Sequence, residues 1–334
     1  MNSLRVGLSG STAAGRAAAL HVRLHDDCDI VIVHDEDARA AHAFAAEAGI
    51  GRSTGDFDEL LGSGVDFVLL TGPLPRRLQQ VQAAAEQGAH VLVQAPMAPD
   101  LATAQAMQRS CDAAGVRLGV AVPWLGDPVI EQLRRMLSAD WLGGLTCVQA
   151  ISGNDAMLHA PSTAPRLHPF LDAGAPLLHL TSWMTGRAVT QVTAQASRLF
   201  SPEVDDSGVA TLALRGNVLA TLIASHLTAV QSFAVHGTDG GVRIAGDRIW
   251  LRGRSTFQGE VFDYPRAGEE LVLARADLLN PLARGAIRTE LLGRFARWID
   301  DRDDYPCPGE QAVADMQVLA ALLRAVQSGR AEQP

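Results

Sequence analysis

Short apolar runs alternate with longer amphipathic segments along the first third of the chain. The runs are rich in Val, Leu and Ile and predict buried strands, whereas the segments between them have helical spacing. Near-continuous apolar strands separated by helices are typical of a parallel sheet that is covered on both faces. The strands are predicted at residues 4–8, 30–35, 65–71, 90–96 and 116–122.

The pattern changes after an amphipathic segment at 127–144. From residue 145 onward, alternating strand patterns dominate, and several of them are joined by glycine-containing turns. One helix is expected at 170–186, and two more return in the tail at 287–301 and 309–329. We therefore predict an α/β protein with a doubly wound parallel Rossmann domain over 1–122. The second domain, over 123–334, should hold a large, mainly antiparallel sheet, with the C-terminal helix packing back on the first domain.

A glycine-rich turn follows the first predicted strand. Gly10, Thr12 and Gly15 occupy the three positions of the G-x-G-x-x-G dinucleotide pattern, and Asp35 ends the next strand twenty residues after Gly15. Gly10 permits the sharp turn, Gly15 lets helix and strand pack closely, and the helix N-terminus offers N–H groups to a pyrophosphate. Asp35 can accept hydrogen bonds from ribose hydroxyls, so the stretch predicts a nucleotide site.

Two side chains of this stretch refine the prediction. Thr12 stands where the pattern has glycine, and its β-branched side chain narrows the approach to a phosphate, although its hydroxyl could donate a hydrogen bond. The carboxylate of Asp35 would repel a ribose phosphate, which favours NAD(H) over NADP(H). Cofactor binding is thus expected but weakened, and its loss stays open.

Ligands of such sheets lie at the carboxyl ends of the strands. The loops that begin at Ser9, Asp35, Thr71, Gln94 and Val122 should therefore surround one crevice. Besides the pattern residues, we expect cofactor contacts from Ser11, Ala14, Thr71, Pro73 and Gln94.

Composition and charge exclude several classes of function. The formal charge of −9 argues against nucleic acid and against an anionic membrane as partners, since both require a basic surface. No apolar stretch is long enough to span a membrane and no signal-peptide layout opens the chain, so a cytoplasmic protein is expected. The four cysteines lack metal or disulfide spacing, and no metal is expected. The chain contains no lysine, which excludes lysine acid, base or Schiff-base chemistry.

The order of landmarks resembles the glucose-fructose oxidoreductase/inositol dehydrogenase/MocA family of two-domain dehydrogenases over nearly the whole chain. RVGLSGSTAAG is similar to the family's nucleotide loop, AAAEQGAHVLVQAP to the segment that usually ends in Glu-Lys-Pro, and LDAGAPLLH to its D-x-G-x-H-x-x-D helix. VDFVLLTGP, HGTDGGVRI and YPCPGEQAVADMQVL match further landmarks. The resemblance implies the two-domain fold, a nicotinamide cofactor, a sugar or polyol substrate, and a homodimer or homotetramer.

The residues that carry the family's usual proton chemistry are mostly replaced here. Ala95 stands at the lysine position and Pro176 at the histidine position, while Asp172 is kept. Alanine and proline cannot carry a proton, and general acid–base help is typically worth ~10²–10⁴ in rate. Another group must therefore do this work if hydride chemistry is retained.

Asp172 and His179 are the candidate catalytic residues. They lie seven residues apart on a predicted helix, two turns along one face and separated by about 10 Å, so a substrate could meet both although they cannot touch. The alternative is that His179 is a partly buried histidine satisfied by a neighbouring element. Pro176 between them is expected to kink the helix.

Three further residues are candidates for substrate binding: Arg77, Trp124 and His168. Arg77 follows the third-strand loop, where paired donors could bind a carboxylate or phosphate, or where it is simply a solvated helix start. Trp124 suggests an apolar or flat ligand, or packing alone. His168 borders a proline- and histidine-rich loop at 158–169. His226 and His236 fall on strand patterns and are expected to be sheet residues.

Two classes of function follow. The first is an atypical NAD(H)-dependent oxidoreductase that acts on a sugar-like, polyol-like or cyclic imine-like small molecule. The second is a family member without hydride chemistry, which catalyses a redox-neutral cyclisation or elimination or only binds a ligand.

Overall fold

The computed structural model describes residues 3–22, 27–122, 124–159, 167–200, 202–274 and 283–334. The chain divides into two compact units, each of which is built from two stretches of sequence. Unit 1 contains residues 1–126 and 282–314, and unit 2 contains residues 127–281 and 315–334. The domain boundary predicted after residue 122 stays a prediction.

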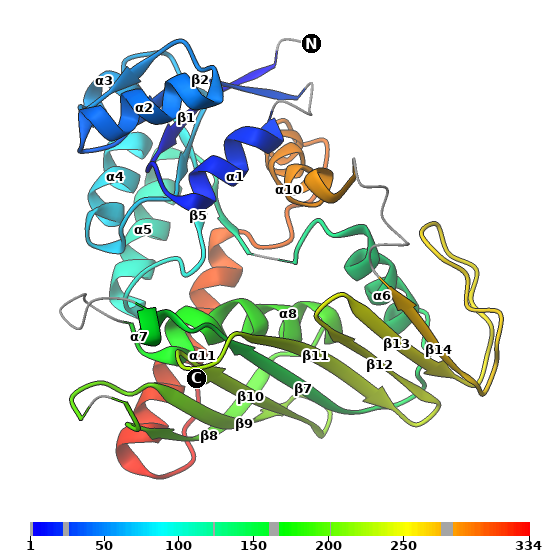
Figure 1. Ribbon diagram of the computed structural model, residues 1–334. Coiled ribbons are helices and arrows are strands. Elements are labelled where there is room, and N and C mark those ends of the chain that lie inside the picture. The colour runs from blue at the N-terminus through cyan, green and yellow to red at the C-terminus, as the bar shows by residue number, and fades with distance from the viewer. Residues whose placement is uncertain (1–2, 23–26, 123, 160–166, 201, 275–282) are drawn as a thin grey trace. The chain divides into compact units, whose positions relative to one another are not determined.

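Unit 1 is built on a six-stranded parallel sheet, as the pattern of apolar runs predicts (Figure 1). The strand order is β3-β2-β1-β4-β5-β6, which is the order of a doubly wound nucleotide-binding sheet. The strands are β1 (Leu4–Ser9), β2 (Cys28–His34), β3 (Ser53–Thr54), β4 (Phe67–Leu70), β5 (His90–Gln94) and β6 (Leu118–Ala121). Their Val, Leu and Ile side chains form the core, and β4 is buried at every position because helices cover the sheet.

The helices of unit 1 begin and end where the local sequence dictates. Asp37, Asp56 and Asp100 each cap a helix by accepting hydrogen bonds from backbone N–H groups in its first turn. Gly49 and Gly115 end two of these helices in the left-handed conformation. The helices are α1 (Ala13–Val22), α2 (Ala38–Ala48), α3 (Phe57–Leu61), α4 (Leu74–Glu86), α5 (Leu101–Ala114) and α10 (Ala283–Ile299).

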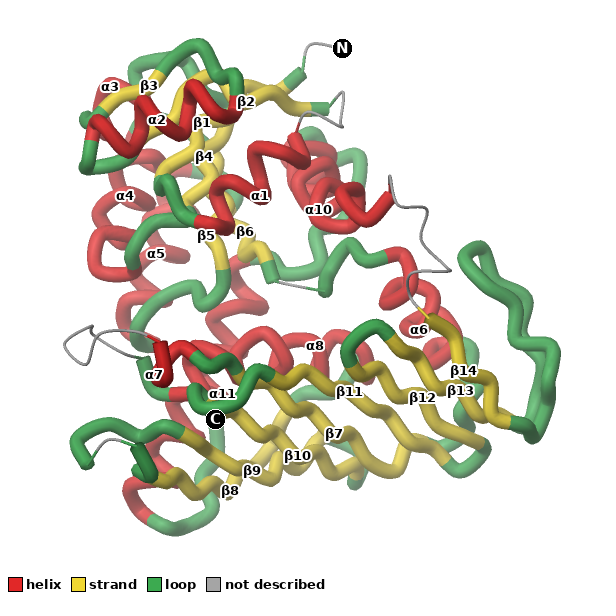
Figure 2. Tube along the Cα trace, viewed as in Figure 1, coloured by secondary structure: helices red, strands yellow, loops and turns green. Residues whose placement is uncertain are grey.

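Unit 2 is built on an eight-stranded sheet in the order β14-β13-β12-β11-β7-β10-β9-β8 (Figure 2). Every neighbouring pair is antiparallel except β7 and β10, which run parallel. The strands are β7 (Leu145–Gly153), β8 (Val189–Ser197), β9 (Ser207–Leu214), β10 (Val218–Ser225), β11 (Val230–Gly237), β12 (Gly240–Ala245), β13 (Arg248–Gly253) and β14 (Glu270–Ala274). The mainly antiparallel sheet is therefore confirmed.

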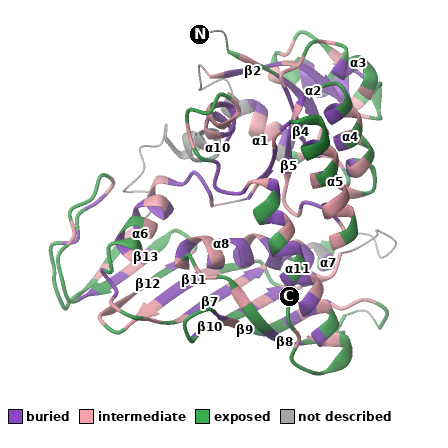
Figure 3. Ribbon diagram, turned by 180° about the vertical axis from the view of Figure 1, so that it is seen from behind, coloured by how far each residue is buried: buried purple, intermediate pink, exposed green. Residues whose placement is uncertain are grey.

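Helices cover one face of this sheet. The π-helix η1 (Phe170–Gly174) and the helix α8 (Ala175–Thr185) pack on β7 and β10. The other helices described here are α6 (Pro128–Ser138), α7 (Ala156–His159) and α11 (Gly309–Ser328), the last of which begins in unit 1 and continues into unit 2. Along β9 and β10, buried residues alternate with more exposed ones, as the burial colours of the ribbon indicate (Figure 3). Leu219 and Val209, each 54% exposed, lie on the uncovered face.

The helix expected at 170–186 is present, and its first part is widened into a π-helix next to the proline. Pro176 has no N–H to donate to the carbonyl of Asp172, so a regular α-helical turn cannot form there. No helix in the described part of the chain is long and apolar enough to cross a membrane.

Candidate functional site

The glycines of the nucleotide loop are required by the backbone. Gly10 has φ +111°, and a Cβ atom there would lie 2.5 Å from the N atom of Gly72, in the loop after β4. A Cβ atom on Gly15 would lie 2.4 Å from the carbonyl oxygen of Gly10. Both positions therefore exclude any side chain, and the sharp turn and the close helix packing are formed as the pattern predicts.

Thr12 acts as the N-cap of α1. Its Oγ1 accepts a hydrogen bond from the backbone N–H of Gly15 at 3.1 Å. This N–H is one of the donors that a helix N-terminus offers to an anion, and here the threonine side chain satisfies it. The hydroxyl hydrogen of Thr12 stays available as a donor to a phosphate oxygen. Ser11 precedes it, and its Oγ is buried without a hydrogen-bond partner among the described residues.

Asp35 lies beside this loop at the end of β2. Its Oδ2 accepts a hydrogen bond from the backbone N–H of Ser11 at 2.8 Å, and its Oδ1 accepts one from Asp37 N–H at 3.1 Å. These contacts fix the carboxylate next to the turn, at the position from which a carboxylate binds ribose hydroxyls in this fold.

Beneath the loop lies a buried polar network. Ser9 Oγ lies 2.9 Å from Nδ1 of His34, and the side-chain amide of Gln80 donates to the same Ser9 oxygen at 3.1 Å. Burial lowers the pKa of His34, and the carboxylates of Asp35, Glu36 and Asp56 offset part of that effect. His34 is therefore favoured as a neutral ring that supports the loop from below.

The neighbouring strand ends carry the other predicted cofactor contacts. Thr71 is buried, and its hydroxyl donates to the carbonyl oxygens of Ser9 at 3.2 Å and Gly10 at 3.0 Å, which ties the loop after β4 to the nucleotide loop. Pro73 is exposed and precedes the first residue of α4, and Gln94 is half-buried at the end of β5. The backbone of Ala14 lies in the first turn of α1, while its side chain is outside the described residues.

The structure places Arg77 inside unit 1, where it is only 4% exposed. Its guanidinium donates to the carbonyl oxygens of Gly72 at 2.9 Å, Gln94 at 2.8 Å, Pro96 at 2.5 Å and Met97 at 3.3 Å. Burial lowers the pKa of Arg77 to about 10, so the group remains charged at neutral pH. Arg77 thereby holds together the loops that follow β4 and β5, and its predicted contact with substrate stays a prediction.

Trp124 lies in unit 1 with φ +83°, a left-handed conformation that is uncommon for a residue other than glycine. Strained backbone of this kind is concentrated at functional sites. The sequence did not reveal the left-handed conformation of Trp124. Its predicted contact with substrate stays a prediction.

In unit 2, Asp172 contacts two residues that sequence reasoning did not assign to it. Oδ2 of Asp172 lies 3.0 Å from Nε2 of His226 and accepts a hydrogen bond from the side-chain amide of Asn154 at 3.2 Å. The hydrogen bond to His226 lowers the pKa of Asp172, burial opposes this, and the charge of His226 and the Asn154 contact lower the pKa further. Asp172 is thus held ionised.

His179 has a different partner. Its Nδ1 lies 2.5 Å from Oδ2 of Asp315 in α11, and the two side chains are only 3% and 11% exposed. The structure therefore brings Asp172 and His179 into two separate carboxylate–imidazole pairs. The arrangement matches the alternative of a histidine satisfied by a neighbouring element, and the catalytic role of His179 stays a prediction.

His168 lies just before η1 and forms a third pair. Its Nε2 is 3.4 Å from Oδ2 of Asp205, and its Nδ1 accepts a hydrogen bond from Phe170 N–H at 3.2 Å. Burial lowers the pKa of His168, Asp205 raises it, and His226 lowers it. The backbone carbonyl of His168 accepts a hydrogen bond from Asp172 N–H at 3.2 Å, so His168 lies next to Asp172.

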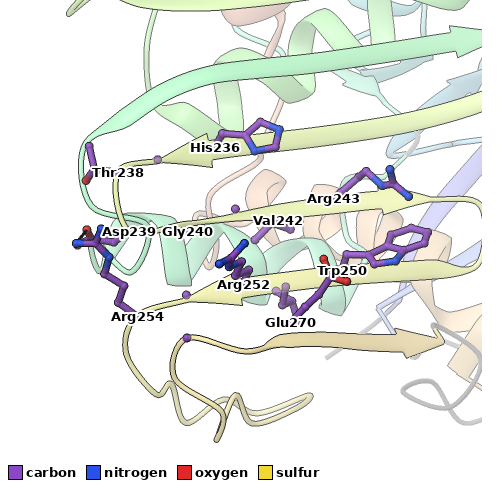
Figure 4. Close-up of a pocket in the computed structure, with 15 residues that line it drawn as sticks. His236, Thr238, Asp239, Gly240, Val242, Arg243, Trp250, Arg252, Arg254 and Glu270 are labelled. Atoms are coloured by element: carbon purple, nitrogen blue, oxygen red, sulfur yellow. Dashed lines mark ion pairs between the residues drawn. The ribbon is translucent and has the colours of Figure 1, made fainter.

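A hollow of about 860 Å³ lies elsewhere in unit 2, over β11 to β13 (Figure 4). In this hollow the guanidinium of Arg243 lies 4.1 Å from the ring centre of Trp250, and Arg254 forms an ion pair with Asp239 at 3.1 Å. No residue that we predicted for the site lines this hollow.

Comparisons with known proteins agree with the fold of both parts of the chain. Residues 4–122 match the family model of an oxidoreductase family with an NAD-binding Rossmann fold, and residues 130–243 match the GFO/IDH/MocA C-terminal domain. The chain is 28% identical to the myo-inositol dehydrogenase Hyg17 of Streptomyces leeuwenhoekii over 209 residues. That match covers 61% of this chain and 63% of the relative.

A second relative matches end to end. The uncharacterized oxidoreductase ORF334 of Rhizobium meliloti is 25% identical, with 99% of both chains covered. A crystal structure of an oxidoreductase from Agrobacterium radiobacter in complex with NAD⁺, L-tartaric acid and magnesium superimposes with a TM-score of 0.83. It is 18% identical and covers 99% of this chain and 98% of its own, so it supports the fold alone. The chain therefore belongs to the glucose-fructose oxidoreductase/inositol dehydrogenase/MocA family of oxidoreductases, with an NAD-binding Rossmann domain at its N-terminus.

Proposed function

We propose that the chain is an NAD(H)-dependent oxidoreductase that acts on a small sugar-like, polyol-like or cyclic imine-like molecule. The observation that carries the proposal is the nucleotide loop, in which Gly10 and Gly15 leave no room for side chains and Asp35 is fixed against Ser11. The orphaned hydroxyl of Ser11 fits a ligand with phosphate oxygens, which would give it a partner. These residues would hold NAD(H), which supplies a hydride acceptor or donor when bound.

Asp35 supports NAD(H) as the cofactor over NADP(H). A carboxylate at this position repels a phosphate on the ribose, and the neighbouring residues Glu36 and Asp37 add negative charge. No lysine exists to bind such a phosphate, and the guanidinium of Arg76 forms an ion pair with Glu36 at 2.9 Å.

We assign the transfer of the substrate proton to Asp172, because the family's usual lysine and histidine positions hold Ala95 and Pro176. Its side chain is 43% exposed, so a substrate hydroxyl can reach the carboxylate. In the direction of oxidation, Asp172 would accept the hydroxyl proton as the carbinol becomes a carbonyl group. In the reverse direction it would return that proton.

A redox-neutral or ligand-binding function is the second candidate. Thr12 favours it, because its hydroxyl already satisfies the N–H of Gly15 that a pyrophosphate would use. Under this alternative, Asp172 would act in cyclisation or elimination, or the chain would only bind a ligand.

We include in the proposal a cytoplasmic homodimer or homotetramer. None of the four cysteines, which all lie in the described part of the chain, forms a disulfide, as is usual in proteins of reducing compartments. The uncovered sheet face exposes Val209, Leu219 and Val272, which a partner copy would bury. Light scattering of the wild type and of Leu219→Arg tests this assembly, and a monomeric wild type would contradict it.

Calorimetric titration with NAD⁺, NADH, NADP⁺ and NADPH tests the cofactor assignment. NAD(H) should bind more tightly than NADP(H), and Asp35→Ala should weaken NAD⁺ binding by about 10–100-fold, since hydrogen bonds to a charged group are worth about 1.5–3 kcal/mol. Glu36→Ala removes a neighbouring exposed carboxylate and should leave the affinity within about twofold. If none of the four nucleotides binds, the proposal falls and the redox-neutral candidate replaces it.

A further inference from the structure

Two parallel strands of unit 2 end side by side, and each is followed directly by a polar residue. β7 and β10 are in register with Gly153 opposite Ser225, the last residue of each strand. The backbone N–H of Asn154 donates to the carbonyl of Ser225 at 3.0 Å. Asn154 and His226 therefore leave the sheet as neighbours, although they are separated by 72 positions in the sequence (226 minus 154).

The π-helix η1 brings the third member to these strand ends. It packs on β7 and β10, and it places Asp172 so that one carboxylate oxygen meets both the amide of Asn154 and the ring of His226. The carboxylate side chain is 43% exposed, whereas the imidazole side chain is only 5% exposed. The carboxylate of the cluster is thus accessible, whereas the imidazole that contacts its Oδ2 is buried. Widened π turns of this kind are frequent at functional sites.

The backbone of His226 is fixed by two hydrogen bonds. The backbone N–H of His226 donates to the carbonyl of Asp206 at 2.9 Å, and the backbone carbonyl of His226 accepts from Met157 N–H at 3.1 Å. The ring is thereby placed with Nε2 at 3.0 Å from Oδ2 of Asp172.

The charged groups around Asp172 and His226 come from several segments. Asp172 contacts the ring of His226 from η1. His168, two residues before η1, is close enough to the ring of His226 for the two to affect each other electrostatically. Asp205, before β9, is paired with His168 and forms an ion pair with Arg198 at 2.8 Å. The buried Asp206 accepts a hydrogen bond from Phe200 N–H at 2.7 Å.

We infer that His226 is the positioning residue for Asp172, in place of the histidine that the sequence lacks at Pro176. This inference rests on the proposed function. The Nε2–H of the buried imidazole faces Oδ2 of Asp172 at 3.0 Å, so it orients the carboxylate and keeps it ionised. The carboxylate is thereby ready to take the proton of the substrate hydroxyl.

The proton balance of the step is complete. The substrate O–H bond breaks and an O–H bond forms on the carboxylate of Asp172. The electron pair of the substrate C–H bond leaves as hydride to an oxidant of the nicotinamide class. The products are a carbonyl compound, a reduced nicotinamide and a protonated Asp172, which releases its proton to water.

The test compares His226→Gln with His159→Gln. His159 forms a matched imidazole–carboxylate pair with Asp155 at 3.2 Å, but its side chain is 72% exposed. Carbon-13 NMR of labelled aspartate should show the pKa of Asp172 rising toward its ordinary value in His226→Gln and unchanged in His159→Gln. If the pKa of Asp172 is the same in His226→Gln as in the wild type, the inference is overturned. This test requires no known substrate. His226→Asn serves if the glutamine variant does not fold.

Kinetics supply a second readout once a substrate is found. His226→Gln should lower kcat by about 10–100-fold, leave KM within about threefold and change the pH profile of kcat, because the base Asp172 loses the group that orients it and lowers its pKa. Unchanged kcat and pH profile would overturn the inference. Calorimetry separates the two claims, because NAD⁺ should bind His226→Gln as it binds the wild type. Absence of NAD⁺ binding in the wild type contradicts the proposed function and not the Asp172–His226 pair.

Discussion

The nucleotide loop in unit 1 and the Asp172 cluster in unit 2 are built in opposite ways. The loop is one continuous stretch, with Asp35 twenty residues beyond Gly15. No residue with a side chain fits at Gly10 or Gly15, because a Cβ atom would clash with the backbone. The cluster joins residues from three separate segments, which become neighbours through the register of β7 and β10 and the packing of η1 on these strands. A local motif can therefore be recognised in the sequence, whereas a cluster built from distant positions cannot.

The largest effect that would sharpen this comparison is on catalysis. Asp172→Asn keeps the shape of the side chain but removes its ability to accept a proton, so turnover should fall by about 10²–10⁴. NAD⁺ affinity should stay unchanged, because the nucleotide loop belongs to the other unit. Steady-state rates and calorimetry measure the two effects separately. Asp155→Asn, which alters the exposed pair with His159, is the control, and equal losses in both variants would remove Asp172 from the mechanism.

The next effect is on stability. Arg77→Met should lower the free energy of unfolding by about 3 kcal/mol, since four carbonyl oxygens lose the charged donor of a buried arginine. Arg76→Met removes an exposed arginine that pairs with Glu36, and it should change the free energy by at most about 0.5 kcal/mol. Urea unfolding followed by circular dichroism compares the two. Equal small losses would show that the Arg77 contacts do not stabilise unit 1.

Substitutions of Thr12 should have a smaller effect, and they should change stability and NAD⁺ affinity in different ways. Thr12→Ala removes the N-cap of α1 and should cost about 1 kcal/mol, whereas Thr12→Gly should cost only a few tenths of that. The glycine variant also frees the N–H of Gly15 and opens the approach to a phosphate, so NAD⁺ should bind it more tightly than the wild type. Unfolding and calorimetry of both variants test this, and weaker binding to Thr12→Gly would assign the threonine hydroxyl a direct role with phosphate.

The smallest expected effect is the dependence of stability on pH through His34. Burial lowers its pKa in the folded chain, so the unfolded chain takes up a proton first as the pH falls below about 6.5. The stability that His34 contributes is thus complete above that pH and is lost as the pH falls through the folded pKa. The Tm of His34→Gln should fall less steeply than that of the wild type between pH 7 and pH 5. A parallel slope would contradict the neutral, buried state of this ring.

The sequence was informative where structure is local. The strands of the parallel sheet, the glycine turn and the helix around Pro176 could be predicted, because the pattern of each lies in a short stretch of the chain. The short α7, the two-residue β3 and the π turn were not predicted, since neighbouring elements decide them. His226 was assigned to a strand, but β10 ends at Ser225, one residue before it.

The pairing of Asp172 could not be read from spacing alone. Helical periodicity places Asp172 and His179 on one face, but the widened turn over 170–174 changes that face, and each residue finds its partner on another segment. The buried position of Arg77 was equally hidden, because an arginine after a strand usually lies in water.

One measurement tests the central claim most directly, namely that the rebuilt cluster supports hydride chemistry with a cofactor held by the retained loop. The wild type and Asp172→Asn would be incubated with NAD⁺ and a panel of cyclic polyols and aldoses, and with NADH and cyclic imines, while the nicotinamide absorbance is followed. We predict an absorbance change with at least one compound that is reduced by about 10²–10⁴ in rate in Asp172→Asn. A wild-type rate that Asp172→Asn leaves unchanged, or no absorbance change across the panel despite tight NAD⁺ binding, would contradict the account.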